Sequence, residues 1–215
     1  MTLGYIEVND HPLTVALRKN YSNILTEFEN LSNKFLGAKP NNLMGEQLNQ
    51  LDSNGKELYN GKIDSVFTRV VADSCSLPEY RAVWGTTEES RIAGDARLKI
   101  KQQMTPVLES IILPYSNYIG CVGFNIMHPD SKLSMHYGMV SKYVRFHLGI
   151  KCDPEAKFIV NKYAPRAWEN GKVWAFDDGD AYHGTVHNGT KTRVILIVDI
   201  DRAAFAELKE EITWG

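Results

Sequence analysis

The sequence predicts a mainly β domain with flanking helices, an α+β fold whose strands are concentrated in the second half of the chain. Apolar residues recur with a helical period in the first half. Residues 118–200 instead consist of short β-rich runs separated by Gly, Pro, Asp and Asn. Such runs are typical of a sandwich, a barrel or a jelly roll. A chain of 215 residues can bury a core without disulfides or metals, so we expect a single domain over 1–215.

The first predicted helix begins near Pro12. Asn9 and Asp10 offer an N-cap, and Gly37 and Pro40 are expected to end the helix. Its apolar residues recur at spacings of three, four or seven along one face: Leu13, Leu17, Tyr21, Ile24, Phe28, Leu31 and Phe35. This spacing predicts one continuous amphipathic helix.

The segments between this helix and the β-rich half are more varied. Residues 38–62 are polar and rich in turn signals, which indicates a surface connection. A strand is expected over 63–72, a loop-rich stretch over 77–95, and a second helix over 96–113. At the other end of the chain, a short amphipathic helix is expected from Ala203 to Ile212.

The β-rich half contains five runs with strand character, at 118–127, 141–150, 156–163, 171–178 and 192–200. Alternation along the second run places Val144, Phe146 and Leu148 on one face. Arg145 and His147 then share the opposite face. A strand with one apolar face and an Arg–His pair on the other is unusual, and it suggests a site.

Composition excludes several classes of protein. The net charge of −2, from 24 basic and 26 acidic residues, indicates no nucleic-acid partner. No apolar run reaches the roughly 18 residues needed to span a membrane, and no signal peptide is visible. Cys75, Cys121 and Cys152 are far apart and odd in number, which favours free thiols in a reducing compartment. We therefore expect a cytoplasmic protein that binds neither nucleic acid nor membrane.

Five of the six histidines lie between residues 128 and 187. Neutral imidazole is the commonest metal ligand, although a single histidine beside an apolar run is more often structural. A jelly roll can join two distant histidines, such as His136 and His183, into the pair of a non-haem iron site. The usual carboxylate of that site often lies two residues after the first histidine, where this chain has Gly138. Arg193 lies in an apolar strand and would need an anionic partner such as a carboxylate, or exposure to solvent.

Several short motifs occur in order between Gly123 and Ile200: FNIMHP at 124–129, His136, RFHLG at 145–149, WENGKV at 168–173, FDD at 176–178, His183, and Arg193 leading into IVD at 197–199. Arg145 is the ninth residue after His136, and Arg193 is the tenth residue after His183. In this order and spacing the sequence resembles the aspartyl/asparaginyl β-hydroxylase family of iron(II)- and 2-oxoglutarate-dependent oxygenases.

This resemblance implies a double-stranded β-helix core, also called a jelly-roll or cupin-like core. We place that core at 118–200, between a helix-rich N-terminal part at 1–117 and a C-terminal helix within 201–215. The resemblance does not clearly extend to the first 120 residues, where substrate selection could lie.

The resemblance also implies the roles of individual residues. His136 and His183 would be the catalytic iron(II) ligands. Arg193 would pair with the distal carboxylate of 2-oxoglutarate, and Arg145 and His147 would hold this cosubstrate from the neighbouring strand. These assignments would make iron(II), 2-oxoglutarate and O2 the cofactor and cosubstrates.

Other residues of the motifs receive weaker assignments. Asn125 and Met127 lie where the family contributes further cosubstrate contacts, and the family often has Ser at the first of these positions. The family lacks the third, carboxylate ligand, so Gly138 agrees with its pattern.

For the remaining motif residues, a structural role is favoured over a role in binding metal or cosubstrate. His128 is expected in a turn or beside the site. His187 is disfavoured as a ligand because its flanks favour strand and turn rather than helix. Asp177 and Asp178 are candidates for the missing carboxylate ligand, but the resemblance implies that they are structural turn residues. Residues 168–171 are interpreted as a turn.

The function implied is hydroxylation of an unactivated C–H bond. Candidate substrates are a peptide or a small molecule, including the β-carbon of an Asp or Asn residue or a free amino acid. Two alternatives stay open. Iron halogenases also lack the carboxylate ligand, and a chloride could occupy the position beside Gly138. A non-catalytic jelly-roll binding module would need none of these side chains together.

Overall fold

The structure is a computed structural model. It describes residues 5–6, 8–35, 59–60, 63–70, 87–138 and 142–207. The expected helix end at Gly37 and Pro40, most of the connection at 38–62, and Cys75 lie outside these residues. None of the helices in the described ranges is long and apolar enough to cross a membrane.

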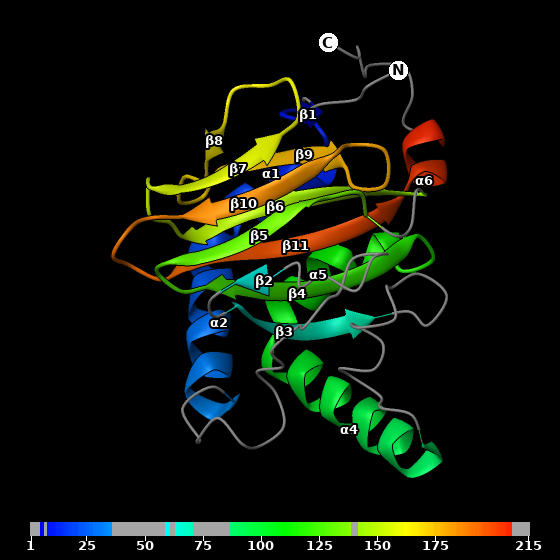
Figure 1. The fold of residues 1–215 in the computed structure, drawn as a ribbon. Helices are drawn as coiled ribbons and strands as arrows, with labels where there is room; N and C mark the ends of the chain where they lie inside the picture. Colours follow the sequence, from blue (N-terminus) through cyan, green and yellow to red (C-terminus); the bar gives the residue numbers. More distant parts are fainter. Residues whose placement is uncertain are drawn as a thin grey trace.

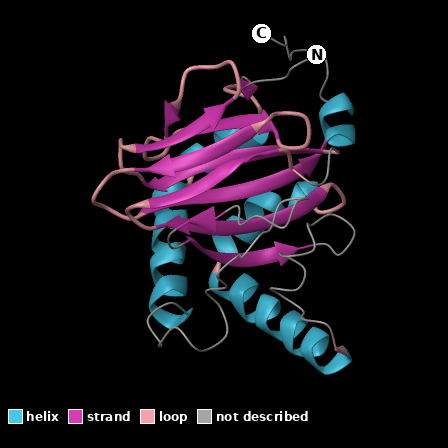
Figure 2. Ribbon diagram, viewed as in Figure 1, coloured by secondary structure: helices cyan, strands magenta, loops and turns pink. Residues whose placement is uncertain are grey.

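Two antiparallel sheets form the centre of the described structure (Figures 1 and 2). The six-stranded sheet has the order β1-β9-β6-β11-β4-β3, and the five-stranded sheet has the order β2-β5-β10-β7-β8. The strands are β1 (Tyr5–Ile6), β2 (Tyr59–Asn60), β3 (Ile63–Val70), β4 (Ile119–Met127), β5 (Ser131–His136), β6 (Tyr143–Lys151), β7 (Ala156–Val160), β8 (Arg166–Ala167), β9 (Val173–Asp177), β10 (His183–His187) and β11 (Arg193–Asp201).

The path of the chain from β4 to β11 confirms the predicted jelly roll. Successive strands alternate between the two sheets: β4, β6, β9 and β11 lie in the larger sheet, and β5, β7 and β10 lie in the smaller one. The short strand β8 pairs with β7. This alternation is the winding of a double-stranded β-helix.

The first 117 residues also supply strands to both sheets. β1 extends the larger sheet beside β9, and β3 extends it beside β4. β2 pairs with β5 in the smaller sheet. The helical part and the β-rich part are therefore joined by main-chain hydrogen bonds as well as by side-chain packing.

Both predicted helices are interrupted, which the apolar spacing did not predict. The helices of the structure are α1 (Pro12–Lys19), α2 (Tyr21–Phe35), α4 (Glu88–Met104), α5 (Pro106–Ile112) and α6 (Arg202–Glu207), with a 3₁₀ turn at Leu113–Tyr115. Asn20 separates α1 from α2, and its side-chain amide donates to the carbonyl of Ala16. Thr105 separates α4 from α5, because Pro106 has no N–H to continue the helix. Asn and Thr side chains can form hydrogen bonds with nearby backbone groups, as Asn20 does, and this weakens a helix locally.

The expected bounds of three helices need correction. The N-cap of α1 is His11 rather than Asn9 or Asp10, because its imidazole Nδ1 accepts the backbone N–H of Leu13 at 3.2 Å. The helix expected over 96–113 begins eight residues earlier, at Glu88. The C-terminal helix begins at Arg202, and its expected continuation to Ile212 lies outside the described residues.

The helices α1, α2 and α5 cover the outer face of the six-stranded sheet, behind the strands in the view of Figure 1. Apolar side chains from both layers form the main core, and its fully buried members include Leu13, Leu17, Ile24, Leu31, Leu108, Phe124, Val144, Phe146, Leu148 and Leu196. The opposite faces of the same strands point toward the smaller sheet. Polar side chains collect on that inner face, which is where the site lies.

Candidate active site

The fold places His136 and His183 side by side. His136 is the last residue of β5 and His183 is the first residue of β10, and the two are direct partners in the antiparallel register. Their ring centroids are 4.4 Å apart. Two histidines far apart in sequence thus converge at one end of the smaller sheet, as expected of a jelly roll.

Both imidazoles are held in the same tautomer by the main chain. His136 Nδ1 lies 2.8 Å from the carbonyl oxygen of Ser134, and His183 Nδ1 lies 2.7 Å from that of Ala181. A carbonyl can only accept, so Nδ1 carries the proton in each ring. Nε2 therefore keeps its lone pair in both. Metal-binding histidines are oriented in this way by a hydrogen bond from the other ring nitrogen, so the donor set fits a metal ion.

Burial keeps both rings neutral. It lowers the pKa of His183 to about 3, and the adjacent imidazole of His136 adds to this shift because two positive charges so close together would repel. The pKa of His136 is also lowered, mainly by burial, although the bond to the Ser134 carbonyl opposes that shift. A neutral imidazole is the form that binds a metal.

Asp178 lies between the histidine pair and Arg145. Its Oδ1 is 3.4 Å from His183 Nε2 and 2.9 Å from Arg145 Nη1. Its backbone carbonyl accepts the N–H of Gly138 at 2.8 Å. A Cβ on Gly138 would collide with the Asp178 carboxylate. The space beside residue 138, where the usual third ligand would start, is therefore filled by a carboxylate from another strand end.

The two neighbouring aspartates have different surroundings. Asp177 has the structural role expected of it: its buried carboxylate accepts the N–H of Asp180 and forms an ion pair with Arg202. Asp178 departs from that expectation, since it contacts Arg145 and one of the paired histidines. Among the described residues, no group of three His, Cys, Asp or Glu side chains is arranged to hold one metal ion.

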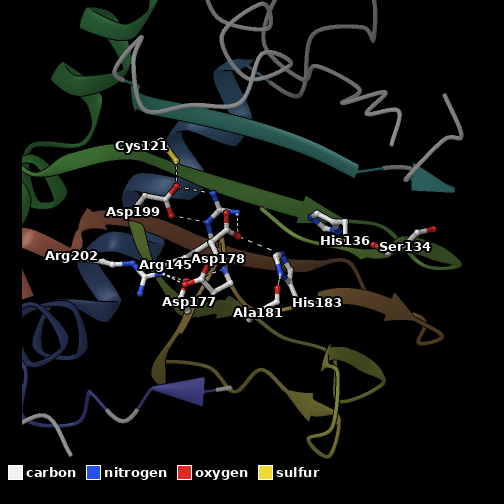
Figure 3. Close-up of polar contacts among 11 residues, drawn as sticks. Cys121, Ser134, His136, Arg145, Asp177, Asp178, Ala181, His183, Asp199 and Arg202 are labelled. Atoms are coloured by element: carbon white, nitrogen blue, oxygen red, sulfur yellow. Dashed lines mark hydrogen bonds and ion pairs between the residues drawn. The ribbon is translucent and has the colours of Figure 1, made fainter. Parts of the chain in front are cut away.

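Arg145 is bound by two carboxylates. Its Nε and Nη2 donate to the two oxygens of Asp199, each at 2.7 Å, and its Nη1 pairs with Asp178. Cys121 Sγ donates to Asp199 Oδ2 at 3.1 Å, the oxygen that also accepts from Arg145 Nη2. Figure 3 shows this series of contacts from Cys121 to His183. These carboxylates hold the pKa of Arg145 well above its ordinary value against the effect of burial. A cosubstrate contact of Arg145 stays a prediction.

Arg193 has the opposite environment. It is 2% exposed, and its Nε and Nη1 have no hydrogen-bond partner in the described part of the chain. Its guanidinium lies 4.6 Å from the centroid of the Trp168 ring. Burial lowers the pKa of Arg193 below its ordinary value, which reflects the cost of an unneutralised buried cation. Such a group is suited to receive an anion that enters the site.

His147 lies on the same inner face, as the alternation along β6 predicts. It is 4% exposed, and its Nδ1 accepts the indole N–H of Trp168 at 3.2 Å. Burial and the nearby charges of Arg145 and Arg193 lower its pKa well below the ordinary value of 6.5. His147 is therefore a neutral, buried ring beside the buried arginine.

The two remaining predicted cosubstrate residues lie on β4. Met127 is fully buried and lies directly opposite Arg193 in the register. Asn125 faces Ile195 across the same strand pair, and its amide donates to Ser65 Oγ at 3.2 Å. Their contacts with a cosubstrate stay predictions.

The other histidines of the cluster are engaged elsewhere. His128 follows β4, and its Nε2 lies 2.9 Å from an Asp64 carboxylate oxygen. His187 lies at the far end of β10. Its Nε2 bonds to the carbonyl of Lys191, and its Nδ1 accepts the N–H of Gly189. With both ring nitrogens occupied, His187 cannot ligate a metal in this arrangement, which agrees with the sequence-based interpretation.

Three residues of the site were missed by the sequence reasoning: Asp199, Asp178 and Trp168. Asp199 carried a signal, because it lies six residues after Arg193 in an apolar strand. An even spacing places both side chains on the same buried face. Asp178 also carried a signal, because an aspartate pair after a β-rich run is a candidate for the missing carboxylate ligand, but the turn interpretation was preferred. Trp168 carried none, since it was placed in a turn that looked structural.

The fold and the site together define a class: a jelly-roll protein with two neutral histidines between its sheets and a buried arginine nearby. The family described as Aspartyl/Asparaginyl beta-hydroxylase matches residues 67–203, more than half of the chain. The chain belongs to this family.

The curated relatives are distant and longer. The mouse aspartyl/asparaginyl beta-hydroxylase is 32% identical over 95 residues, which cover 42% of this chain and 13% of that protein. The human aspartate beta-hydroxylase domain-containing protein 2 is 28% identical over 88 residues, covering 40% of this chain and 23% of that protein. The matched part is thus less than a quarter of either relative.

Two solved structures align with the chain at low sequence identity. A viral collagen prolyl hydroxylase from Paramecium Bursaria Chlorella virus-1, solved as a 2OG complex, aligns with a TM-score of 0.39 and 9% identity over 82% of this chain and 90% of its own. A predicted oxalate decarboxylase from Thermotoga maritima aligns with a TM-score of 0.41 and 10% identity over 76% of this chain and 96% of its own.

The charge pairing of Arg145 leads to a prediction about stability. The substitution Arg145→Met leaves the buried carboxylates of Asp199 and Asp178 without their cation. We expect it to lower the free energy of unfolding by about 3–5 kcal/mol, measured by urea denaturation. The double substitution Arg145→Met/Asp199→Leu should recover part of that loss. A single variant as stable as the wild type would contradict the pairing.

Proposed function

We propose that the chain is an iron(II)- and 2-oxoglutarate-dependent dioxygenase that hydroxylates an unactivated C–H bond. The observation that carries the proposal is the pair His136 and His183, whose Nε2 lone pairs are left free by identical main-chain contacts. Membership of the aspartyl/asparaginyl β-hydroxylase family supports the type of reaction. The substrate class we propose is a peptide or small molecule, including the β-carbon of an Asp or Asn residue or a free amino acid.

The chain's own residues would bind and orient the reactants. His136 and His183 would hold iron(II), which when bound supplies oxygen activation coupled to decarboxylation of 2-oxoglutarate. Arg193 would pair with the distal carboxylate of the cosubstrate, because it is a buried cation with unpartnered N–H groups. The aromatic side chains of Phe158, Trp168 and Phe176 belong to the inner core beside these residues and would keep water away.

Hydroxylation is favoured over halogenation by the position of Asp178. A halogenase needs a vacant anion position where the third ligand is missing. Here the carboxylate of Asp178 fills the space beside Gly138, and a chloride in that space would meet a negative charge. The electrostatics therefore support oxygen transfer.

The ligand assignment is tested by turnover. We expect a substrate screen with iron(II), ascorbate and 2-oxoglutarate to give succinate with the wild-type chain. His136→Ala should abolish this, because one imidazole alone holds the metal poorly. His128→Ala is a matched control, since His128 pairs with Asp64 away from the two rings, and it should retain turnover. Retained turnover in His136→Ala would show that the assignment is wrong.

The role of Arg193 is tested by kinetics. We expect Arg193→Met to raise the KM for 2-oxoglutarate by about 30-fold or more, with a smaller effect on kcat, because it removes ground-state binding of a carboxylate. Arg166→Met removes a half-buried arginine that stacks on Tyr5 and Trp174, and should leave this KM near the wild-type value. Equal KM values in the two variants would place the cosubstrate elsewhere.

The halogenation alternative is tested by product mass. Turnover reactions with and without chloride should give the same hydroxylated product, since Asp178 leaves no anion position beside Gly138. A chlorinated product in the chloride reaction would overturn the hydroxylase proposal.

A further inference from the structure

We propose that Trp168 is a positioning residue that prepares His147 and Arg193 together to receive the cosubstrate carboxylate. This inference rests on the proposed function and deepens it. Trp168 directly follows β8, is 2% exposed, and contacts both residues with different parts of its ring system. Its indole N–H donates to His147, and its ring face lies against the guanidinium of Arg193.

The first contact decides which nitrogen of His147 carries the proton. An indole N–H can only donate, so His147 Nδ1 must accept and must be unprotonated. In a neutral imidazole the proton then lies on Nε2. Trp168 thereby turns His147 into a hydrogen-bond donor at Nε2, which is the form that can bind a carboxylate oxygen.

The second contact stabilises Arg193 without using its hydrogen-bonding groups. The Trp168 ring centroid lies 4.6 Å from Arg193 Cζ, within the range of a cation–π interaction. Because the face of an aromatic ring is not an ordinary hydrogen-bond acceptor, this contact leaves Nε and Nη1 unpartnered within the described residues. A carboxylate partner from the protein would stabilise the cation too, but it would also occupy those N–H groups, as Asp199 does for Arg145.

The main chain around Trp168 is tied to the strand that carries His147. The N–H of Gly171 donates to the carbonyl of Gly149, and the N–H of Gly149 donates to the carbonyl of Lys172. A Cβ on Gly149 would collide with the carbonyl of Glu169, so this close approach requires glycine. The turn after Trp168 is therefore fastened to β6 two residues beyond His147.

The chain offers a matched control in Trp174. This second tryptophan is also buried, at 3% exposed, and lies in the same aromatic cluster, with its ring 5.7 Å from that of Trp168. Its ring centroid is 4.7 Å from that of His147, but its Nε1 has no hydrogen-bond partner among the described residues. Trp174→Phe thus makes the same change in the same cluster without removing a bond to His147.

The tautomer of His147 can be measured by NMR. We would record long-range 1H–15N spectra of the full chain with 15N-labelled histidine, and assign His147 from the signals lost in His147→Gln. The wild type and Trp174→Phe should show His147 protonated at Nε2. Trp168→Phe should show a mixture of tautomers, because its ring keeps the packing but lacks the donor.

Binding of 2-oxoglutarate gives the second readout, by calorimetry on iron(II)-loaded protein without oxygen. Trp168→Phe should raise the Kd about fivefold, for the loss of one ordered donor. Trp168→Leu should raise it roughly 50-fold, since the ring over Arg193 is lost as well. Trp174→Phe should bind like the wild type.

The outcomes separate the inference from the proposed function. If the wild type binds no 2-oxoglutarate, the proposed function fails and the inference fails with it. If the wild type binds and Trp168→Phe matches Trp174→Phe in both tautomer and Kd, the inference alone is overturned. Protonation of His147 at Nδ1 in the wild type would also overturn it.

Discussion

The antiparallel pairing of β5 with β10 is the interaction on which the candidate site depends. It places His136 opposite His183 at the point where one strand ends and the other begins. The carbonyls of Ser134 and Ala181 then accept hydrogen bonds from the two Nδ1–H groups. Main-chain geometry therefore decides both the separation of the rings and the nitrogen that each presents, before any ligand is bound.

The second constraint is the burial of charge on the inner face of the larger sheet. Arg145 and Arg193 both lie there, on strands that are hydrogen-bonded neighbours. Arg145 is neutralised by two carboxylates, whereas among the described residues Arg193 has the ring of Trp168 against it and two N–H-bearing nitrogens without a partner. A protein gains nothing in stability from a buried cation without an anion, so that arrangement is best explained by a ligand.

Much of the site could be predicted because side-chain alternation is a local property of a strand. A strand with one apolar face must turn Arg145 and His147 to the other face. Arg193 was identified by a second local argument, the energetic cost of a charge within an apolar strand. The same argument, applied to every charged residue of that strand, would also have identified Asp199. The helix breaks at Asn20 and Thr105 were not predictable from apolar spacing, because the apolar stripe continues across both of them.

The sequence by itself determined the jelly-roll class, the histidine pair and the buried arginine, since these follow from strand periodicity and from motif order. Tertiary structure alone decided that Asp178 fills the space beside Gly138 and that Trp168 joins His147 to Arg193. Both contacts bring a turn residue against a distant strand. Their geometry depends on how two sheets and their connections pack, which no local pattern encodes.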